Sequence, residues 1–299
     1  MKVAVLGMGK MGNALAERLL QGGNTVSVWN RTKRPFAELI DKGAIVLDTP
    51  SQAWEHADFV VSFVSDDDAL NSVYLDATGL LAGNTSNGIA IDMSTVSPKA
   101  SSRIAKLAGE ARIAFLRSPV SGNPHALSAG TLTLLVSGPK DAFAKAEELL
   151  KASGSKVIYL GPAEESRVVK LAINSVLAAT TEMIAEMIVL CETNGIDRST
   201  LLNALGNSSI GSPFIAAKTP GLVSRNYDAT FTAAMLSKDM KLALELAGSD
   251  SLILPVTSLS ADLISKTCEA GFADLDFAAL LPRLQIELGK EADATASSK

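Results

Sequence analysis

A lysine and an asparagine lie four positions apart in a long helical pattern, where they could share one chemical task. Lys170 and Asn174 fall on one face of the predicted helix, because residues four apart are neighbours on a helix surface. The residues around them are apolar, namely Val168, Val169, Leu171, Ile173, Val176 and Leu177. A partly desolvated ammonium can donate a proton to a developing alkoxide, and an amide can orient either partner. From the spacing alone, a lysine that extends its charge to solvent is an equally good interpretation.

A glycine pattern near the start of the chain predicts a dinucleotide site. Residues 7–12 read Gly7-Met8-Gly9-Lys10-Met11-Gly12, a G-x-G-x-x-G sequence between a predicted strand and a predicted helix. The first glycine permits a tight turn, the second lets a pyrophosphate approach the backbone, and the third lets the helix pack on the strand. We therefore expect cofactor contacts from Gly7, Met8, Gly9, Met11 and Gly12. A glycine turn that only packs is the alternative.

The residues after the second predicted strand indicate which dinucleotide binds. NAD-selective sites carry Asp or Glu about 20 residues after the glycine turn, where the carboxylate binds the ribose 2′-hydroxyl. This chain has Asn30-Arg31-Thr32 there, followed by Lys33 and Arg34. A guanidinium attracts a 2′-phosphate that a carboxylate would repel, so Asn30, Arg31 and Thr32 predict NADP(H). A solvated basic turn is the alternative.

The order of the predicted elements indicates a chain of two parts. Short apolar strands are expected at 2–6, 24–29, 58–64, 89–92, 113–116 and 132–136, with helical patterns between them. This alternation is typical of βαβ units, and hence of a Rossmann-type parallel sheet in the α/β class. Beyond it only helical patterns follow. We expect an NADP-binding domain over 1–162, a long interdomain helix over 163–193, an all-α domain for substrate binding and oligomerisation over 194–290, and a disordered tail over 291–299.

Composition and charge argue against several other classes of protein. The 299 residues include 27 Lys and Arg against 32 Asp and Glu, and the net charge of −5 disfavours nucleic acid or an anionic membrane as the main partner. Two cysteines and two histidines are too few and too dispersed for a metal site. Polar residues interrupt the longest apolar stretch, and the first residues lack a signal-peptide core. We therefore expect a cytoplasmic protein without a bound metal.

Several further motifs recur in a fixed order along the chain. They are Asp92–Pro98, Ser118–Gly122, Gly130–Leu132, Val136–Gly138, Lys170 with Asn174, and Lys238-Asp239. Together with the glycine turn, they resemble the β-hydroxyacid dehydrogenases, the group of 3-hydroxyisobutyrate dehydrogenase and the semialdehyde reductases. The resemblance covers about residues 1–290. It implies an oxidoreductase that interconverts a small aldehyde or semialdehyde acid and its hydroxyacid, and a homodimer or homotetramer.

The resemblance also implies roles for individual residues. Catalysis falls to Lys170 as general acid and base, with Asn174 beside it. Four cofactor contacts are implied beyond the glycine turn, namely Val64, Ser65, Thr95 and Lys238. From the residues alone, the stretch after Asp92 could equally be a strand end in which Ser94 or Thr95 caps the next helix.

The loop expected to hold the substrate departs from the family pattern. The family motif is D-A-P-V-S-G-G, whereas this chain has Arg117, Ser118 and Asn123 in place of the Asp, the Ala and the second Gly. A hydroxyl and loop amides after a strand end can bind a carboxylate, so we expect Ser121, Gly122 and Asn123 to contact the substrate. The Asn123 side chain would narrow the loop and favour a short acid, and its amide could also bond an additional oxygen, which would favour a hydroxylated acid.

Two other functions remain open on the sequence. Imine reductases share this architecture, but they usually lack a lysine at the position of Lys170. A non-catalytic dinucleotide-binding protein would be expected to lose Lys170 or Asn174, and this chain has both.

Overall fold

The chain divides into two compact units, Met1–Leu171 and Ala172–Lys299, in a computed structural model. The structure describes residues 1–33, 35–83, 88–249 and 252–294, so the predicted contribution of Arg34 lies outside the described residues. The division between the units lies inside a long helix rather than before it, where the sequence suggested a boundary.

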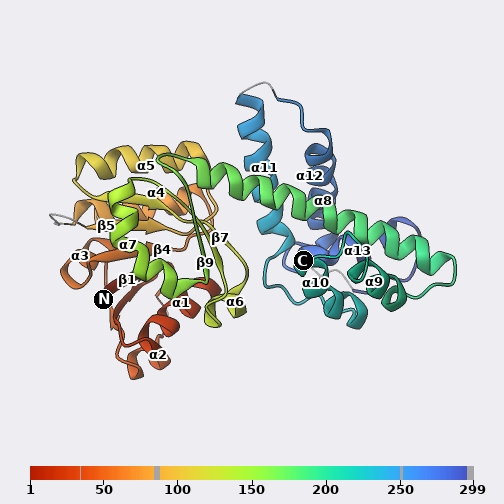
Figure 1. Cartoon of the computed structure of the whole chain (residues 1–299), viewed down its shortest axis with the longest axis horizontal. Helices are drawn as coiled ribbons and strands as arrows, with labels where there is room; N and C mark the ends of the chain where they lie inside the picture. Colours follow the sequence, from red (N-terminus) through yellow and green to blue (C-terminus); the bar gives the residue numbers. More distant parts are fainter. Residues whose placement is uncertain (34, 84–87, 250–251, 295–299) are drawn as a thin grey trace. The chain divides into compact units, whose positions relative to one another are not determined.

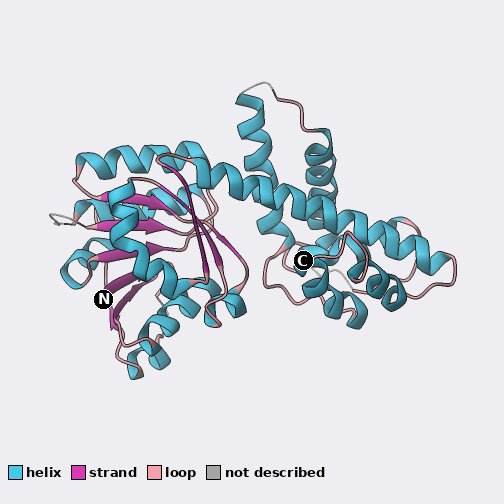
Figure 2. Ribbon diagram, viewed as in Figure 1, coloured by secondary structure: helices cyan, strands magenta, loops and turns pink. Residues whose placement is uncertain are grey.

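Unit 1 is built on a sheet of nine strands in its described residues, with helices on both faces (Figures 1 and 2). The strands follow the order β3-β2-β1-β4-β5-β6-β8-β7, and β9 pairs with β8. Their bounds are β1 Lys2–Leu6, β2 Thr25–Trp29, β3 Ile45–Val46, β4 Phe59–Ser62, β5 Ile89–Asp92, β6 Ala114–Arg117, β7 Val120–Ser121, β8 Thr133–Ser137 and β9 Lys156–Gly161. Strands β1 to β6 pair in parallel, which confirms the predicted Rossmann-type fold.

The helices of unit 1 bury both faces of this sheet. They are α1 Lys10–Gln21, α2 Ala37–Asp41, α3 Ala53–His56, α4 Asp67–Leu75, α5 Pro98–Glu110, α6 Pro124–Ser128 and α7 Lys140–Ser153, with 3₁₀ turns at Pro50–Gln52 and Leu80–Ala82. Successive side chains of a strand point to opposite faces. Val3 and Val5 of β1 therefore pack in a core that includes residues of α1 and α7, whereas Ala4 and Leu6 pack in a core that includes residues of α4 and α5.

The far edge of the sheet differs from the all-parallel arrangement that the sequence predicted. Strand β8 runs antiparallel to β6 and to β7, and only β9 pairs with it in parallel. A parallel pair needs a full crossover connection, usually a helix of several turns. The chain between β6 and β8 contains only the two-residue β7 and the five-residue α6, so it reverses direction.

Unit 2 is helical in its described residues, as predicted. Helix α8 runs from Glu165 to Thr193 and crosses the boundary between the units. The other helices are α9 Arg198–Gly206, α10 Pro213–Ser224, α11 Ala233–Ser249, α12 Pro255–Thr267 and α13 Leu280–Glu287, with a π-helical segment at Cys268–Phe272 and a 3₁₀ turn at Phe277–Ala279. By length and hydropathy alone α8 could cross a membrane. Its buried residues, which include Ala178, Ile184 and Ile188, lie in the core of unit 2, so packing inside the protein accounts for part of this hydropathy.

Side-chain caps explain where several helices begin. Ser97 accepts a hydrogen bond from the Ala100 amide at 2.9 Å and precedes Pro98, the first residue of α5. The cap of α5 is therefore Ser97, not Ser94 or Thr95. Asp197 caps α9 in the same way, and hydrogen bonds from Ser199 and Thr200 lower the pKa of this carboxyl to about 2.

The segment after α13 contradicts the predicted disordered tail over its first residues. The carboxylate of Asp293 pairs with Arg198 and accepts a hydrogen bond from the Tyr227 hydroxyl at 3.0 Å. Only 1% of the Asp293 side chain is exposed. Arg225 Nε lies 3.3 Å from the same carboxylate. A buried charge with these three partners fixes this position, whereas residues 295–299 lie outside the described part of the chain.

Candidate active site

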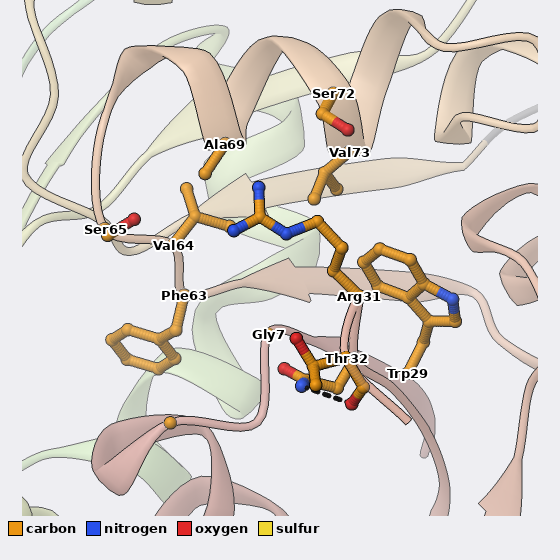
Figure 3. Close-up of a pocket in the computed structure, with 12 residues that line it drawn as sticks. Gly7, Trp29, Arg31, Thr32, Phe63, Val64, Ser65, Ala69, Ser72 and Val73 are labelled. Carbon is orange, nitrogen blue, oxygen red and sulfur yellow. Dashed lines mark hydrogen bonds between the residues drawn. The ribbon is translucent and has the colours of Figure 1, made fainter. Parts of the chain in front are cut away.

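A pocket of about 210 Å³ opens where the loops after β1, β2 and β4 meet the side of α4 (Figure 3). Seven residues predicted from the sequence line it, namely Gly7, Gly9, Asn30, Arg31, Thr32, Val64 and Ser65. The pocket thus brings together the glycine turn, the basic turn and the end of β4, which are separated by up to 58 positions in the sequence. The carboxyl ends of parallel strands meet at one edge of the sheet, which is where α/β folds bind ligands.

The glycines of the turn are required by close backbone approach. Gly7 has φ +93°, and a Cβ there would lie 2.0 Å from the carbonyl oxygen of Phe63. A Cβ at Gly12 would lie 2.1 Å from the carbonyl oxygen of Gly7. At Gly9, by contrast, no atom lies within 4 Å of a Cβ position, so the backbone there borders open space. A loop that packs at both ends and is open in the middle fits a pyrophosphate above the N-terminus of α1.

Asn30 ties the glycine turn to the basic turn. Its Oδ1 accepts a hydrogen bond from the Met8 amide at 2.9 Å, and its Nδ2 donates to the Thr32 carbonyl at 2.9 Å. Both polar atoms of the side chain are thus engaged by backbone. A carboxylate at this position could not donate to Thr32, which gives a structural reason for the neutral amide. Met8 itself contributes this amide while its side chain is buried.

Arg31 extends across the pocket toward Val64 and α4 (Figure 3). Its side chain is exposed, and its guanidinium makes no hydrogen bond or ion pair with any residue that the structure describes. The pocket also contains residues that the sequence analysis missed, namely Trp29, Phe63, Ala69, Ser72 and Val73. Trp29 and Phe63 sit at strand ends beside predicted residues, and the other three share one face of α4. The helical spacing of residues 69, 72 and 73 could have indicated that they share one face of a helix next to the predicted site.

The remaining predicted cofactor residues do not line this pocket. Met8 lies within the glycine turn, Met11 and Gly12 lie in the first turn of α1, and Thr95 lies between β5 and α5. Thr95 follows Ser94, whose Oγ accepts a hydrogen bond from the Val64 amide at 2.8 Å. The loop after β5 is therefore attached to the pocket through Val64. Lys238 belongs to α11 in unit 2.

The predicted substrate loop follows β7. Gly122 has φ +134°, and a Cβ there would lie 2.5 Å from Leu132 Cδ2, so the turn requires glycine. Asn123 is the N-cap of α6, and its Oδ1 accepts a hydrogen bond from the Ala126 amide at 2.9 Å. The Asn123 oxygen is thus used by the helix, which corrects the expectation that this side chain simply narrows the loop. Ser121 remains partly exposed.

Arg117, the largest departure from the family motif, is buried and paired. Its Nε and Nη2 donate to Glu164 Oε1 at 2.9 and 2.5 Å, and its guanidinium lies 5.1 Å from the centre of the Phe115 ring. Only 7% of the Arg117 side chain is exposed. Its charge is therefore directed at the segment before α8 and is compensated there.

Lys170 lies on α8 in unit 1, and its surroundings are less apolar than the sequence suggested. The side chain is partly buried, and Leu171 is buried. Val168 and Val176, however, are 43% and 67% exposed, so the expected buried stripe is incomplete. Amphipathic packing on one side leaves the other face of this helix at the surface.

Asn174 lies one turn further along α8 and takes part in a cluster within unit 2. Its Nδ2 donates to Asp239 Oδ2 at 2.6 Å, and Lys238 Nζ lies 2.7 Å from Asp239 Oδ1. Asp239 thus joins Asn174 to Lys238. The sequence analysis placed Asp239 in the Lys238-Asp239 motif and assigned it no role. Among the described residues, no group of three or more His, Cys, Asp or Glu could hold a metal ion.

Comparisons with known proteins account for nearly the whole chain. Residues 2–161 match the family described as the NAD binding domain of 6-phosphogluconate dehydrogenase. Residues 165–284 match the family described as the NAD-binding of NADP-dependent 3-hydroxyisobutyrate dehydrogenase. Both halves therefore match families of nicotinamide-dinucleotide enzymes.

Individual relatives agree with these matches. The chain is 31% identical to glyoxylate/succinic semialdehyde reductase 1 of Arabidopsis thaliana, over 94% of this chain and 97% of the relative. It is 30% identical to an NAD-dependent L-serine dehydrogenase of Pseudomonas aeruginosa, over 92% and 95%. A solved structure of Mycobacterium tuberculosis 3-hydroxyisobutyrate dehydrogenase with L-serine has a TM-score of 0.86 at 26% identity, covering 95% and 99%. An imine reductase from Pseudomonas sp. shares the fold, with a TM-score of 0.62 at 22% identity over 94% and 98%.

Proposed function

This chain belongs to the 3-hydroxyisobutyrate dehydrogenase family of β-hydroxyacid dehydrogenases, and from that premise we propose that it is an NADP(H)-dependent reductase of a short aldehyde or semialdehyde acid. The observation that carries the proposal is the pocket in which the G-x-G-x-x-G turn meets Asn30 and Arg31. Its chemistry fits a dinucleotide, since the glycine turn borders it with open space at Gly9 and the exposed guanidinium of Arg31 extends across it (Figure 3).

The preference for NADP(H) rests on charge. Asn30 is neutral and engaged by backbone, and Arg31 offers forked donors that no described residue occupies. A 2′-phosphate would gain a bidentate contact there and meet no carboxylate from the pocket lining. Because an NAD-dependent relative exists, the choice of cofactor needs a direct test.

The chain's own residues would serve the reaction as follows. The bound nicotinamide supplies the hydride. Lys170 delivers a proton to the alkoxide that develops on the substrate oxygen, a contribution of typically 10²–10⁴ to the rate. Ser121 and the amides of its loop hold the substrate carboxylate, and Asn123 secures that loop through its cap on α6. Asp239 holds the amide of Asn174 in one orientation.

Two alternatives have less support. An imine reductase shares the fold at low identity, and Lys170 is the proton donor that such enzymes usually lack. A non-catalytic binding protein would have no need for the Asn174–Asp239–Lys238 cluster, which is intact here.

The test is NADPH and NADH oxidation with a panel of glyoxylate, succinic semialdehyde, tartronate semialdehyde, their neutral aldehyde analogues and cyclic imines. We expect kcat/KM to favour NADPH over NADH by at least ~10-fold, about 1.4 kcal/mol. A carboxylate substrate should be preferred, and Ser121→Ala should raise its KM while leaving the neutral analogue nearly unchanged. The proposal fails if uncharged aldehydes or imines outperform every acid, and the cofactor assignment fails if NADH is used equally well.

We also propose that the chain forms a homodimer or homotetramer through its helical unit. Val176, Met183 and Leu190 recur every seven residues on α8 and are 67%, 57% and 54% exposed. An apolar row of this spacing is suited to packing against a second helix. Light scattering at micromolar concentration would give a monomeric mass if this is wrong.

A further inference from the structure

A fully buried ion pair lies three residues before Lys170 on α8, and the reaction described above makes no use of it. Arg167 Nη2 lies 2.5 Å from Asp92 Oδ2, and the two side chains are 1% and 0% exposed. Asp92 is the last residue of β5. Removing two charges from water is costly, and their attraction compensates only where the remaining donors and acceptors are also paired.

The pair meets this condition from several directions. Arg167 Nη1 donates to the Ser94 carbonyl at 2.5 Å, and Nε donates to Ser101 Oγ on α5 at 3.3 Å. Asp92 Oδ1 accepts from Ser62 Oγ at 2.6 Å and from Ser94 Oγ at 2.7 Å. A planar guanidinium with three fixed acceptors has one orientation available, so the side chain of Arg167 is fixed in direction as well as in place.

The same network reaches the dinucleotide pocket. Ser94 Oγ accepts from the amide of Val64, a residue that lines the pocket (Figure 3). Ser62 Oγ also lies 3.1 Å from the hydroxyl of Tyr74 on α4. Burial, and then the charge of Asp92, raise the pKa of Tyr74 above its usual value, so this hydroxyl stays neutral and can donate. Strand β4, strand β5, helix α4 and helix α8 are thus joined by one set of buried polar contacts.

We propose that Arg167 is a positioning residue that fixes the start of α8, and with it Lys170, against the loops after β4 and β5. Lys170 lies three residues further along, about 4.5 Å along the helix axis at 1.5 Å per residue. All of these residues belong to unit 1. The inference rests on the proposed function, because it assigns Arg167 the task of aiming the proposed proton donor.

The energetics favour orientation over stability as the role of this pair. Apolar side chains of similar volume often stabilise a core as well as a buried ion pair does, because desolvation offsets much of the Coulomb attraction. An apolar pair, however, would not fix the rotation of α8 about its axis. A small error in that rotation would move the Lys170 ammonium away from the substrate oxygen, and misplacement by about 1 Å can cost about 10²-fold in rate.

The test compares Arg167→Met, Arg167→Lys, the double variant Arg167→Met with Asp92→Asn, and the control Arg283→Met. Arg283 is a matched buried arginine, 3% exposed and paired with Glu182 at 2.8 Å in unit 2. For each protein we would measure kcat and KM for the best acid substrate, NADPH affinity by fluorescence titration, and Tm.

We expect Arg167→Met to lower kcat by about 10–100-fold, with KM and NADPH affinity changed by less than about threefold. Arg167→Lys should recover part of kcat, because an ammonium can still pair with Asp92. The double variant removes the unpaired carboxylate, so it should regain Tm without regaining kcat. Arg283→Met should lower Tm with kcat unchanged.

Two results would overturn the proposal for an active wild-type enzyme: kcat recovering together with Tm in the double variant, or Arg283→Met lowering kcat as much as Arg167→Met does at equal loss of Tm. A wild-type protein that oxidises neither NADPH nor NADH with any panel substrate would instead reject the proposed function, and this inference with it.

Discussion

Two residues of α8, one before and one after Lys170 in the sequence, each pair with a buried carboxylate, and the surroundings of the two carboxylates differ. Asp92 pairs with Arg167, three residues before the lysine, and both side chains are at most 1% exposed. Asp239 holds Asn174, four residues after it, and pairs with Lys238, whose side chain is 27% exposed. In the first cluster, serine hydroxyls donate to the second oxygen of Asp92, so that both oxygens of this carboxylate are paired inside the protein. In the second cluster, the cation Lys238 is partly exposed to solvent.

The difference indicates how similar ion pairs can serve different tasks. In the Asp92 network every contact is internal, so its effect is to fix backbone and side-chain direction in unit 1. In the Asp239 cluster the carboxylate orients Asn174 and also restrains Lys238, a proposed cofactor contact. A partly exposed ammonium can exchange one partner for a phosphate, whereas a fully buried guanidinium cannot.

The largest expected effect is at Lys170, which lies between Arg167 and Asn174 in the sequence of α8. Lys170→Ala should lower kcat by about 10²–10⁴, because the proton donor is removed while both clusters remain. NADPH affinity should hardly change. Steady-state kinetics with fluorescence titration would measure both, and Lys99→Ala, an exposed lysine on α5, is the control. Near-wild-type turnover, with chemistry shown to be rate-limiting, would remove Lys170 from the mechanism.

Substitution of Asp239 would disrupt the Asn174–Asp239–Lys238 cluster, whose lysine is partly exposed. Asp239→Ala should lower kcat/KM by about 10–100-fold, because loss of a charged partner costs about 1.5–3 kcal/mol and leaves Asn174 and Lys238 unrestrained. Asp276→Ala is the matched control, since Asp276 is a buried carboxylate paired with Lys218 in the same unit. Equal kinetic losses in the two variants would show that Asp239 only stabilises unit 2.

Asn30 tests whether unit 1, which holds the Asp92 network, also sets cofactor choice. Asn30→Asp adds a charge that repels a 2′-phosphate and loses the donor to Thr32, so the ratio of NADPH to NADH use should fall by at least about tenfold. Arg31→Ala should shift the ratio in the same direction without disturbing the Met8 amide. An unchanged ratio in both variants would place the selectivity elsewhere.

The Arg117–Glu164 pair tests whether a third buried ion pair near α8 affects only stability. A double-mutant cycle of Arg117→Met and Glu164→Gln should give a coupling of about 1 kcal/mol in urea unfolding, with kcat nearly constant. The pair is less closed than Asp92–Arg167, because 18% of the Glu164 side chain is exposed. A kcat loss as large as that of Arg167→Met would extend the positioning role to Arg117.

Substitution of Asp293 should have the smallest effect, a change in stability that depends on pH. Burial opposes its ionisation, but hydrogen bonds and charge from Arg198 outweigh this and lower the pKa of Asp293. Its contribution to stability is therefore present above the unfolded pKa of about 3.9 and is lost as pH falls through the lower folded value. The stability difference between wild type and Asp293→Asn should be constant above about pH 5 and shrink below about pH 4. A difference that grows on acidification would contradict this sign.

The sequence predicted the fold well because apolar runs and helical spacing are local signals. Strand β1, the glycine turn and helix α8 all follow from neighbouring residues. The two-residue strands β3 and β7 carry too few residues for a pattern, and the antiparallel β8 depends on a connection whose geometry no local signal encodes.

The candidate site was predicted in part for the same reason. Residues of the glycine and basic turns were identified by motif, and seven of the predicted residues line one pocket. Arg167 was overlooked because its partner Asp92 is 75 positions away, and a single sequence does not reveal such pairs. Asn123, which departs from the family motif, was expected to contact the substrate, and no local signal showed that its oxygen caps α6.

The position of the boundary within α8 has a consequence for recombining such proteins. The unit that carries the dinucleotide pocket extends to Leu171, and so it retains Arg167 and Lys170. A crossover placed near residue 162, where the sheet ends, would take Asp92 from one parent and the residue at position 167 from the other. Where that residue is not a cation, the buried carboxylate would lose its charged partner. Chimeras that exchange the helical unit between relatives should therefore be joined after Leu171, so that the whole network is inherited from one parent.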